Sequence, residues 1–271
     1  MPAPCDSPIL RANYFSHHPA NEQHGEQLNM ITLHRFGPFL GAPDSSPFVI
    51  KTMMLLKLAG LEYRAVQGNP LNAPLRFLPY IIDEGVTVAD STLIRHHLEQ
   101  KYGCDFDASL SPQQKALAWA IERMCEDHLY FAMLESRWMD RAIFRNGVAT
   151  MFGAVPAPLR PVARIALRRM NAARLRGHGL GRLSKAKIAT LATCDIDSLA
   201  TLLGDKPYLM GGQPCGADTT VFGMVASILT PPLNSPLRAT MGKHANLVKY
   251  RDSLMREYFP QFSNHLAAAG P

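Results

Sequence analysis

The chain has 271 residues, of which 47% are hydrophobic and 18% are charged, and its formal net charge is +6. This length allows one large domain or two of ordinary size, and the composition is that of a folded chain with a substantial core. No run of about 18 apolar residues is present to span a bilayer, and the first thirty residues lack the apolar stretch of a secretory signal. These features predict a globular, cytoplasmic protein.

The cysteines are odd in number and widely scattered, with no Cys-x-x-Cys pair and no metal-ligand spacing. They are Cys5, Cys104, Cys125, Cys194 and Cys215. This pattern argues against a disulfide framework, a zinc site and a dithiol redox centre.

The first elements follow from apolar runs and turn residues. The polar, aperiodic start predicts a disordered leader over residues 1–29, with residue 30 as an alternative start of the protein. A strand is expected over Ile31–Phe36. Ser46 as N-cap and Pro47 in the first turn then predict a helix that ends before Gly60.

Short apolar runs separated by turn residues predict a second strand, an irregular proline-containing link and a hairpin. Their ranges are Leu61–Val66, 67–75, Tyr80–Asp83 and Val86–Ala89. Asp90 or Ser91 caps the next helix, which ends at Gly103.

Beyond Gly103 the periodicity is that of long helices, and no strand pattern returns. Ser111, Pro112 and Gln114 form a capping-box start for one helix. Further helices are predicted over 161–176, 184–203, 217–229 and 247–258. The sequence thus predicts an α+β domain with a mixed sheet over 30–103, an all-α helical bundle over 104–262 and a tail over 263–271.

Four motifs in this order resemble those of the glutathione S-transferase superfamily. They are Ser46-Pro47-Phe48, Leu78-Pro79-Tyr80-Ile81, Asp90-Ser91-Thr92-Leu93-Ile94 and Gly216-Ala217-Asp218-Thr219-Thr220-Val221-Phe222. The proline-rich second segment and the phrase around Asp90 look closest to the failed-axon-connections and metaxin-like branch, whose members are often not established enzymes. The resemblance implies a thioredoxin-like first domain with a cis Leu78–Pro79 bond, followed by the family's helical domain.

The chain departs from the family pattern in three places. Cys215 stands where the helix N-cap is usually Ser or Thr, and it is a weaker hydrogen-bond acceptor. The loop over 37–46 is longer than in typical transferases. Phe36 ends the first strand, so a tyrosine-type active site is not expected.

The resemblance implies that glutathione is bound as a co-substrate and that Ser46 is the catalytic residue. A thiolate is favoured at a helix N-terminus, and the Ser46 hydroxyl would donate a hydrogen bond to it, with Ser45 as the fallback. The competing interpretation is that Ser46 only caps its helix.

The same resemblance assigns the rest of glutathione to two further segments. The backbone of Leu78, before Pro79, would pair with the cysteinyl part like an added strand. Asp90 and Ser91 would hold the γ-glutamyl end at a helix N-terminus. A structural turn at Pro79 and a plain helix cap at Asp90 explain the same residues, so both interpretations stay open.

The basic residues are concentrated in one segment. Residues 137–187 contain twelve Lys or Arg and a single acid, Asp140, which gives this segment +11 and the rest of the chain −5. Arg160, Arg164 and Arg168 recur every four residues beside apolar positions, as in an amphipathic cationic helix. A solvated helix face, a peripheral membrane contact and a pocket for acidic ligands are the alternatives, and no nucleic-acid-binding motif accompanies the charge.

Two hypotheses about function follow. In the first, the chain is a serine-type glutathione transferase that conjugates glutathione to a small electrophile held by the helical domain. In the second, it is a non-catalytic adaptor or membrane-associated binding protein of the same fold. A homodimer is compatible with both, and no metal is expected in either.

Overall fold

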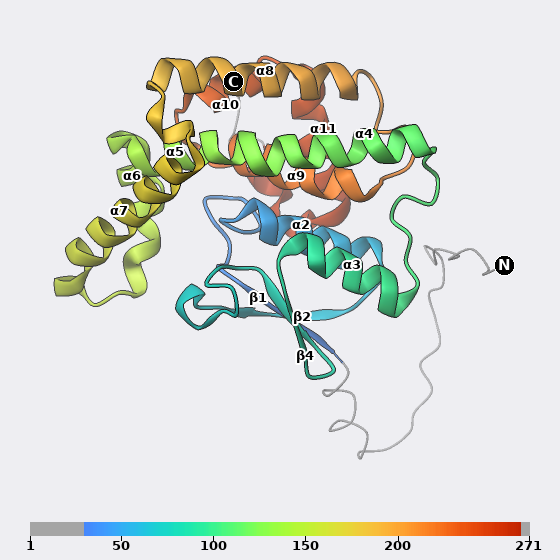
Figure 1. Ribbon diagram of the computed structural model, residues 1–271, viewed down its shortest axis with the longest axis horizontal. Helices are drawn as coiled ribbons and strands as arrows, with labels where there is room; N and C mark the ends of the chain where they lie inside the picture. The colour runs from blue at the N-terminus through green and yellow to red at the C-terminus, as the bar shows by residue number, and fades with distance from the viewer. Residues whose placement is uncertain (1–29, 267–271) are drawn as a thin grey trace.

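The computed structural model describes residues 30–266 (Figure 1). The predicted leader over 1–29 and the last five residues of the predicted tail lie outside the described residues. A four-stranded sheet is followed by a stack of helices, which confirms the predicted fold class.

The sheet has the strand order β2-β1-β3-β4. The strands are β1 (Ile31–Arg35), β2 (Tyr63–Gln67), β3 (Tyr80–Asp83) and β4 (Val86–Ala89). β1 runs parallel to β2 and antiparallel to β3, and β3 forms a hairpin with β4. The predicted hairpin is confirmed residue for residue, while the outer limits of the first two strands shift by one or two positions.

Helices α2 (Pro47–Leu58) and α3 (Ser91–Tyr102) lie between the sheet and the helical stack (Figure 1). Both end as predicted at glycines in the left-handed conformation, with φ of 67° at Gly60 and 70° at Gly103. The link between β2 and β3 contains one short 3₁₀ turn, η1 (Pro70–Asn72), so the expected absence of a regular helix there is confirmed.

The described chain after Tyr102 contains helices and short helical turns. The helices are α4 (Pro112–Arg123), α5 (Tyr130–Met139), α6 (Arg141–Asn146), α7 (Arg160–His178), α8 (Lys185–Leu203), α9 (Gly216–Leu229), α10 (Pro236–Gly242) and α11 (Ala245–Tyr258). A π-helical turn, η2 (Met124–Leu129), joins α4 to α5. The 3₁₀ turns are η3 (Val148–Ala154), η4 (Ala157–Leu159), η5 (Leu180–Arg182) and η6 (Pro260–His265), and the predicted tail begins inside the last of these.

Helix α9 is the centre of the molecule, because every one of its residues is buried. Its Gly223 faces the first turn of α2, where an added Cβ atom would lie 2.5 Å from the carbonyl oxygen of Pro47. Glycine is therefore needed for the two helices to approach this closely.

The start of α9 is fixed by Asp218. Its buried carboxylate accepts hydrogen bonds from the backbone N–H groups of Leu209 (2.8 Å) and Cys215 (2.9 Å) and from the Tyr250 hydroxyl (2.8 Å). Asp218 is thus a structural residue, and it compensates for the weak cysteine cap.

Candidate functional site

The ends of three strands meet at one edge of the sheet. His34 of β1 is paired with Tyr80 of β3, and Tyr80 is paired with Ala89 of β4. The chain therefore leaves β1, enters β3 and leaves β4 at the same end. The segments at this end contain all the predicted site residues, Ser45, Ser46, Leu78, Pro79, Asp90 and Ser91.

Three polar groups at this edge make no hydrogen bond within residues 30–266. The hydroxyl of Ser46 stands at the N-cap of α2 but does not bond to the helix backbone. The bond between Leu78 and Pro79 is cis, as predicted. The backbone of Leu78 also has no hydrogen-bond partner among these residues, and neither does the Ser91 hydroxyl. The groups that are expected to face a ligand therefore have no hydrogen-bond partner within the described chain.

Asp90 behaves differently, because its carboxylate caps α3. It accepts hydrogen bonds from the backbone N–H groups of Thr92 (2.8 Å) and Leu93 (3.2 Å). Its φ of 79° is unusual for a residue other than glycine and costs on the order of 1–3 kcal/mol, a strain that clusters at ligand sites. The helix-cap interpretation thus holds for the Asp90 side chain, which leaves the Ser91 hydroxyl as the free group of this segment.

Sequence reasoning missed Asp44, which orders the loop before α2. Its carboxylate is 1% exposed and accepts hydrogen bonds from the backbone N–H groups of Gly37 (2.7 Å) and Ser46 (3.0 Å). Burial raises the pKa of Asp44 to about 7, although these hydrogen bonds and Arg35 oppose the rise. Asp44 therefore fixes the backbone of the predicted catalytic serine.

Arg137 from α5 fixes the same loop from the helical side. Its guanidinium donates to the carbonyl oxygens of Ser45 (2.8 Å) and Ser227 (2.6 Å) and lies over the ring of Phe39, 5.5 Å from its centroid. Burial lowers the pKa of Arg137 to about 10. The long loop over 37–46 is therefore held in one position by contacts to both halves of the molecule.

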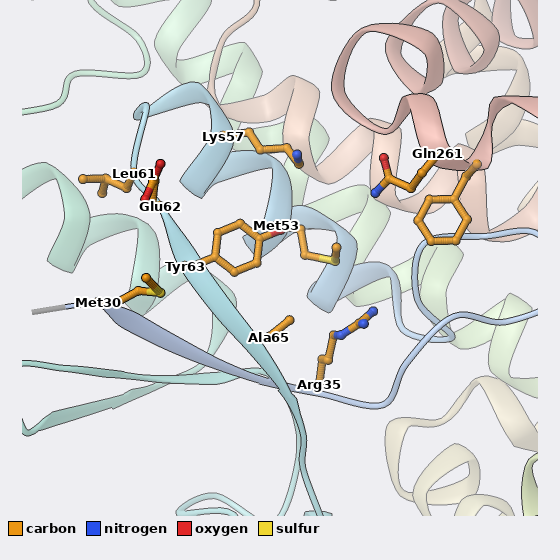
Figure 2. Close-up of a pocket in the computed structure, with 10 residues that line it drawn as sticks. Met30, Arg35, Met53, Lys57, Leu61, Glu62, Tyr63, Ala65 and Gln261 are labelled. Atoms are coloured by element: carbon orange, nitrogen blue, oxygen red, sulfur yellow. The ribbon is translucent and has the colours of Figure 1, made fainter. Parts of the chain in front are cut away.

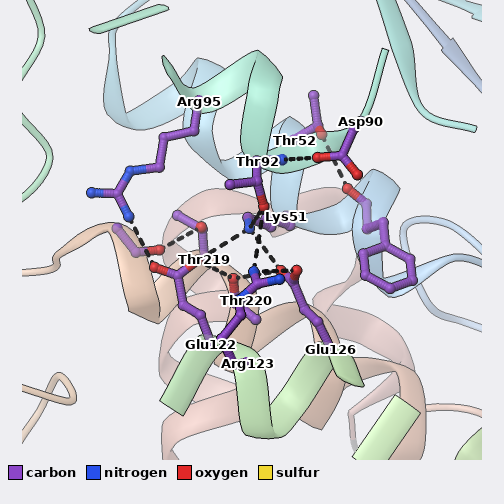
Figure 3. A network of polar contacts seen from close by, with 12 residues as sticks. Lys51, Thr52, Asp90, Thr92, Arg95, Glu122, Arg123, Glu126, Thr219 and Thr220 are labelled. Atoms are coloured by element: carbon purple, nitrogen blue, oxygen red, sulfur yellow. Dashed lines mark hydrogen bonds and ion pairs between the residues drawn. The ribbon is translucent and has the colours of Figure 1, made fainter. Parts of the chain in front are cut away.

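A network of buried charges connects α2 and α3 to the helical domain (Figure 3). Lys51 of α2 is 1% exposed, and its ammonium group lies 3.1 Å from Glu122, 2.7 Å from Glu126 and 3.2 Å from the Thr92 hydroxyl. Arg95 of α3 pairs with the same Glu122 at 2.9 Å. Because Thr92 belongs to the first turn of α3 and Lys51 to the second turn of α2, this network sets the relative position of the N-terminal halves of the two helices.

Aromatic side chains lie beside the start of α2. The ring of Phe48 meets the ring of Tyr130 edge-on at 4.7 Å, and Tyr130 packs in turn on Phe131. Arg174 of α7 donates a hydrogen bond to the Tyr130 hydroxyl at 3.3 Å. Tyr130 follows the π-helical turn η2 directly, and such turns are frequent at functional sites.

A hollow of about 670 Å³ lies elsewhere, beside β2 and the second half of α2 (Figure 2). Its lining includes Arg35, Lys57, Tyr63 and Gln261, and none of the predicted site residues. It adjoins residue 30, where the described part of the chain begins. We therefore do not assign the site to this hollow.

The predicted cationic helix exists as α7, but the alternative of a solvated arginine face does not hold for Arg160, Arg164 and Arg168. Each of the three arginines donates to backbone carbonyls of the segment before the helix. The acceptors are Val155 and Gly153 for Arg160, Ala149 for Arg164, and Trp138 and Met139 for Arg168.

Metal-ligand clusters and membrane-spanning helices are both absent from residues 30–266. No group of three His, Cys, Asp or Glu side chains there has the arrangement of a metal site. No helix in this part of the chain is long and apolar enough to cross a membrane. His97, which lies in α3, contacts the buried Asp83 at 2.7 Å instead.

The thioredoxin-like sheet, the cis proline and the helical domain define the class of the protein as a glutathione-transferase-type fold. Residues 47–143 match the glutathione S-transferase N-terminal domain, and residues 192–254 match the glutathione S-transferase C-terminal domain. The isoprene-epoxide–glutathione S-transferase of Rhodococcus sp. strain AD45 is 32% identical over 84% of this chain and 99% of its own length. The chain belongs to the glutathione S-transferase family.

Other relatives are similar to this chain at lower identity. Failed axon connections of Drosophila melanogaster is 26% identical over 87% of this chain and 60% of its own length, and metaxin-3 of Danio rerio is 28% identical over 86% and 71%. Among solved structures, a beta-etherase of Sphingobium sp. strain SYK-6 has a TM-score of 0.62 at 14% identity and covers 87% of this chain and 99% of its own. The match to both branches confirms the resemblance inferred from the motifs.

Proposed function

We propose that the chain binds glutathione at the sheet edge and conjugates it to a small electrophile. The observation that carries this proposal is the set of three unpaired groups at that edge: the Ser46 hydroxyl, the Leu78 backbone and the Ser91 hydroxyl. They stand on three separate segments and face a shared end of the sheet. Unpaired polar groups of this kind are suited to an extended anionic ligand.

Each group has a role in this proposal. The Leu78 backbone pairs with the cysteinyl residue as an added strand. The Ser91 hydroxyl and the N-terminus of α3 bind the γ-glutamyl carboxylate. The N-terminus of α2 favours the thiolate, and the Ser46 hydroxyl donates a hydrogen bond to its sulfur.

For the second substrate we propose an epoxide or a comparable small electrophile, since one relative is named for an epoxide substrate. The aromatic side chains of Phe48 and Tyr130 offer an apolar wall beside the first turn of α2. The thiolate attacks a ring carbon, the carbon–oxygen bond breaks with its electron pair on oxygen, and that oxygen takes up a proton. Tyr130 is the hydroxyl that we assign as the proton donor, with Arg174 on its oxygen to stabilise the phenolate.

The non-catalytic adaptor remains the second candidate, because metaxins and failed axon connections match most of this chain. A homodimer and a cytoplasmic location also remain predictions. The membrane contact expected through Arg160, Arg164 and Arg168 is not proposed in that form, because these side chains bind carbonyls of their own domain.

Calorimetric titration with glutathione distinguishes the two candidates. We expect binding at millimolar concentration or better, and Ser91→Ala should weaken it by about 1–3 kcal/mol because its hydrogen bond is to a charged group. Ser46→Ala should leave binding nearly unchanged and lower turnover with an epoxide, since its hydrogen bond is to the reacting sulfur. Ser184→Ala, which removes the cap of the distant helix α8, is the matched control and should change neither quantity.

Absence of measurable glutathione binding would contradict the transferase proposal and leave the non-catalytic adaptor as the remaining candidate. Normal binding with no effect of Ser46→Ala on turnover would keep the glutathione site and reject Ser46 as the catalytic residue, with Ser45 the next residue to replace.

A further inference from the structure

Helix α7 presents a row of apolar side chains to solvent, while Arg160, Arg164 and Arg168 turn toward the protein, on the side that also contains the buried Leu175 and the partly buried Leu167. Val162, Ile165 and Met170 are 67%, 54% and 57% exposed, and Leu159, directly before the helix, is 56% exposed. With about 3.6 residues per turn, these positions fall on one side of the helix. A surface helix normally has one apolar stripe, toward the core, so the second, exposed stripe of α7 is unusual. We name Leu159, Val162, Ile165 and Met170 the α7 face.

The orientation of the helix is fixed by specific contacts on its inner side. Arg164 and Arg168 donate to main-chain carbonyls and lie over the rings of Phe152 (5.7 Å) and Phe144 (4.9 Å). These cation–π contacts and charge-assisted hydrogen bonds hold the arginines inward. The apolar side chains on the other side are consequently kept in water unless a partner covers them.

The charges around the α7 face are positive. Arg169 and Arg176 are exposed and lie on the same side of the helix as the face. The same segment adds six more exposed cations, Arg141, Arg145, Arg174, Arg182, Lys185 and Lys187. Asp140 is the single acid of residues 137–187, and it is occupied by Lys185 at 3.3 Å and by the N-terminus of α6. Helices α6 and α7 form an arm at one edge of the molecule, where a flat surface has access to them (Figure 1).

We propose that the α7 face is a docking site for an anionic lipid surface. The four apolar side chains enter the interface between headgroups and acyl chains, and Arg169 and Arg176 contact lipid phosphates. A second copy of the chain fits this face poorly, because pairing two copies would bring together two segments of +11 each. The contact is peripheral, it depends on surface helix α7 alone, and it is independent of the proposed transferase activity.

Vesicle co-sedimentation of the full chain tests the proposal. The vesicles contain one part phosphatidylglycerol to two parts phosphatidylcholine, and vesicles of phosphatidylcholine alone serve as the reference. We expect binding to the anionic vesicles that weakens as salt is added, with little binding to the reference vesicles. The triple variant Val162→Ser/Ile165→Ser/Met170→Ser should bind at least about tenfold more weakly than the native chain. Its matched control, Leu71→Ser/Val86→Ser, changes equally exposed apolar residues outside α7 and should bind as the native chain does.

Charge is tested by a second pair of variants. Arg169→Glu/Arg176→Glu should reduce binding by about tenfold or more, since each exchange replaces attraction to the anionic surface by repulsion. Lys243→Glu/Lys249→Glu makes the same change in net charge on exposed residues elsewhere and should have a small effect. Circular dichroism of each variant verifies that the chain is folded.

Two outcomes would overturn the proposal. One is absence of binding to anionic vesicles. Equal losses of binding in the test and control variants count in the same way, because they would show that only net charge matters. The other is a dimer in sedimentation velocity that the triple variant abolishes while vesicle binding is absent, which would assign the face to a second copy.

Discussion

Replacement of Lys51 by methionine tests whether the buried charge network holds the two halves of the molecule together. The ammonium group of Lys51 lies 3.1 Å from Glu122 and 2.7 Å from Glu126, and all three side chains are at least nine-tenths buried. Removing one member of a buried ion pair leaves uncompensated charge in a medium of low polarity, which costs about 3–5 kcal/mol.

The ion pairs that the two carboxylates keep in Lys51→Met determine where the loss of stability falls between about 3 and 5 kcal/mol. Glu122 keeps Arg95 at 2.9 Å, and Glu126 keeps Arg123 at 2.6 Å, so neither carboxylate becomes wholly unpaired. We therefore expect a loss near the lower limit, about 3 kcal/mol in the free energy of unfolding.

Urea unfolding followed by circular dichroism measures this quantity, provided that both halves unfold in a single transition. Lys57→Met is the matched control, because Lys57 belongs to the same helix, is exposed and has no ion pair in the described part of the chain. Its effect should stay within about 0.5 kcal/mol. A loss below about 1 kcal/mol for Lys51→Met, or equal losses for the two variants, would refute the assignment of the network as the connection between the domains.

Three further predictions concern single side chains. Folding raises the pKa of Asp44 to about 7, so its contribution to stability is full below about pH 4, is lost as the pH rises through 7 and amounts to about 4 kcal/mol. In Asp44→Asn, thermal melts between pH 5 and pH 8 should therefore show a flatter dependence, and an unchanged slope would refute the assignment. Asp218→Asn should destabilise the protein by about 1–3 kcal/mol in urea, because one buried N–H donor loses its acceptor; a neutral result would contradict its structural role. Tyr130→Phe should leave glutathione affinity unchanged and lower turnover of an epoxide about 100-fold, whereas full activity would reject it as the proton donor.

Local signals made the element boundaries predictable from the sequence. The caps at Ser111 and Asp90 and the stops at Gly60 and Gly103 lie where these residue types have their conformational preferences. The predicted cis bond at Pro79 came from family resemblance instead, since the sequence around a proline does not by itself fix the isomer.

The buried network was not predicted, because its members are far apart in the sequence. Lys51 stands in an otherwise apolar run, and its partners follow 71 and 75 residues later. Two features of the sequence indicate such a network. A lysine stands inside an apolar stripe, and Glu122 and Glu126 lie one helical turn apart.

The orientation of α7 could not be predicted from the sequence, for a different reason. The spacing of four in Arg160, Arg164 and Arg168 correctly placed them on one side of a helix, but their partners are backbone carbonyls. Every residue type carries a carbonyl, so the sequence holds no sign of such partners. The sequence therefore favours a solvent-facing arginine side and gives no signal for the exposed apolar side.

The contact between Gly223 and Pro47 limits which helical domains can pack on this sheet domain. A helical domain from a relative with a larger residue at this position would displace the first turn of α2, and with it Ser46. Exchange of whole domains between family members should therefore give destabilised chimaeras unless the residues of this contact are transferred together. Ser46, the proposed catalytic residue, lies in the sheet domain, but its position depends on Gly223 of the helical domain.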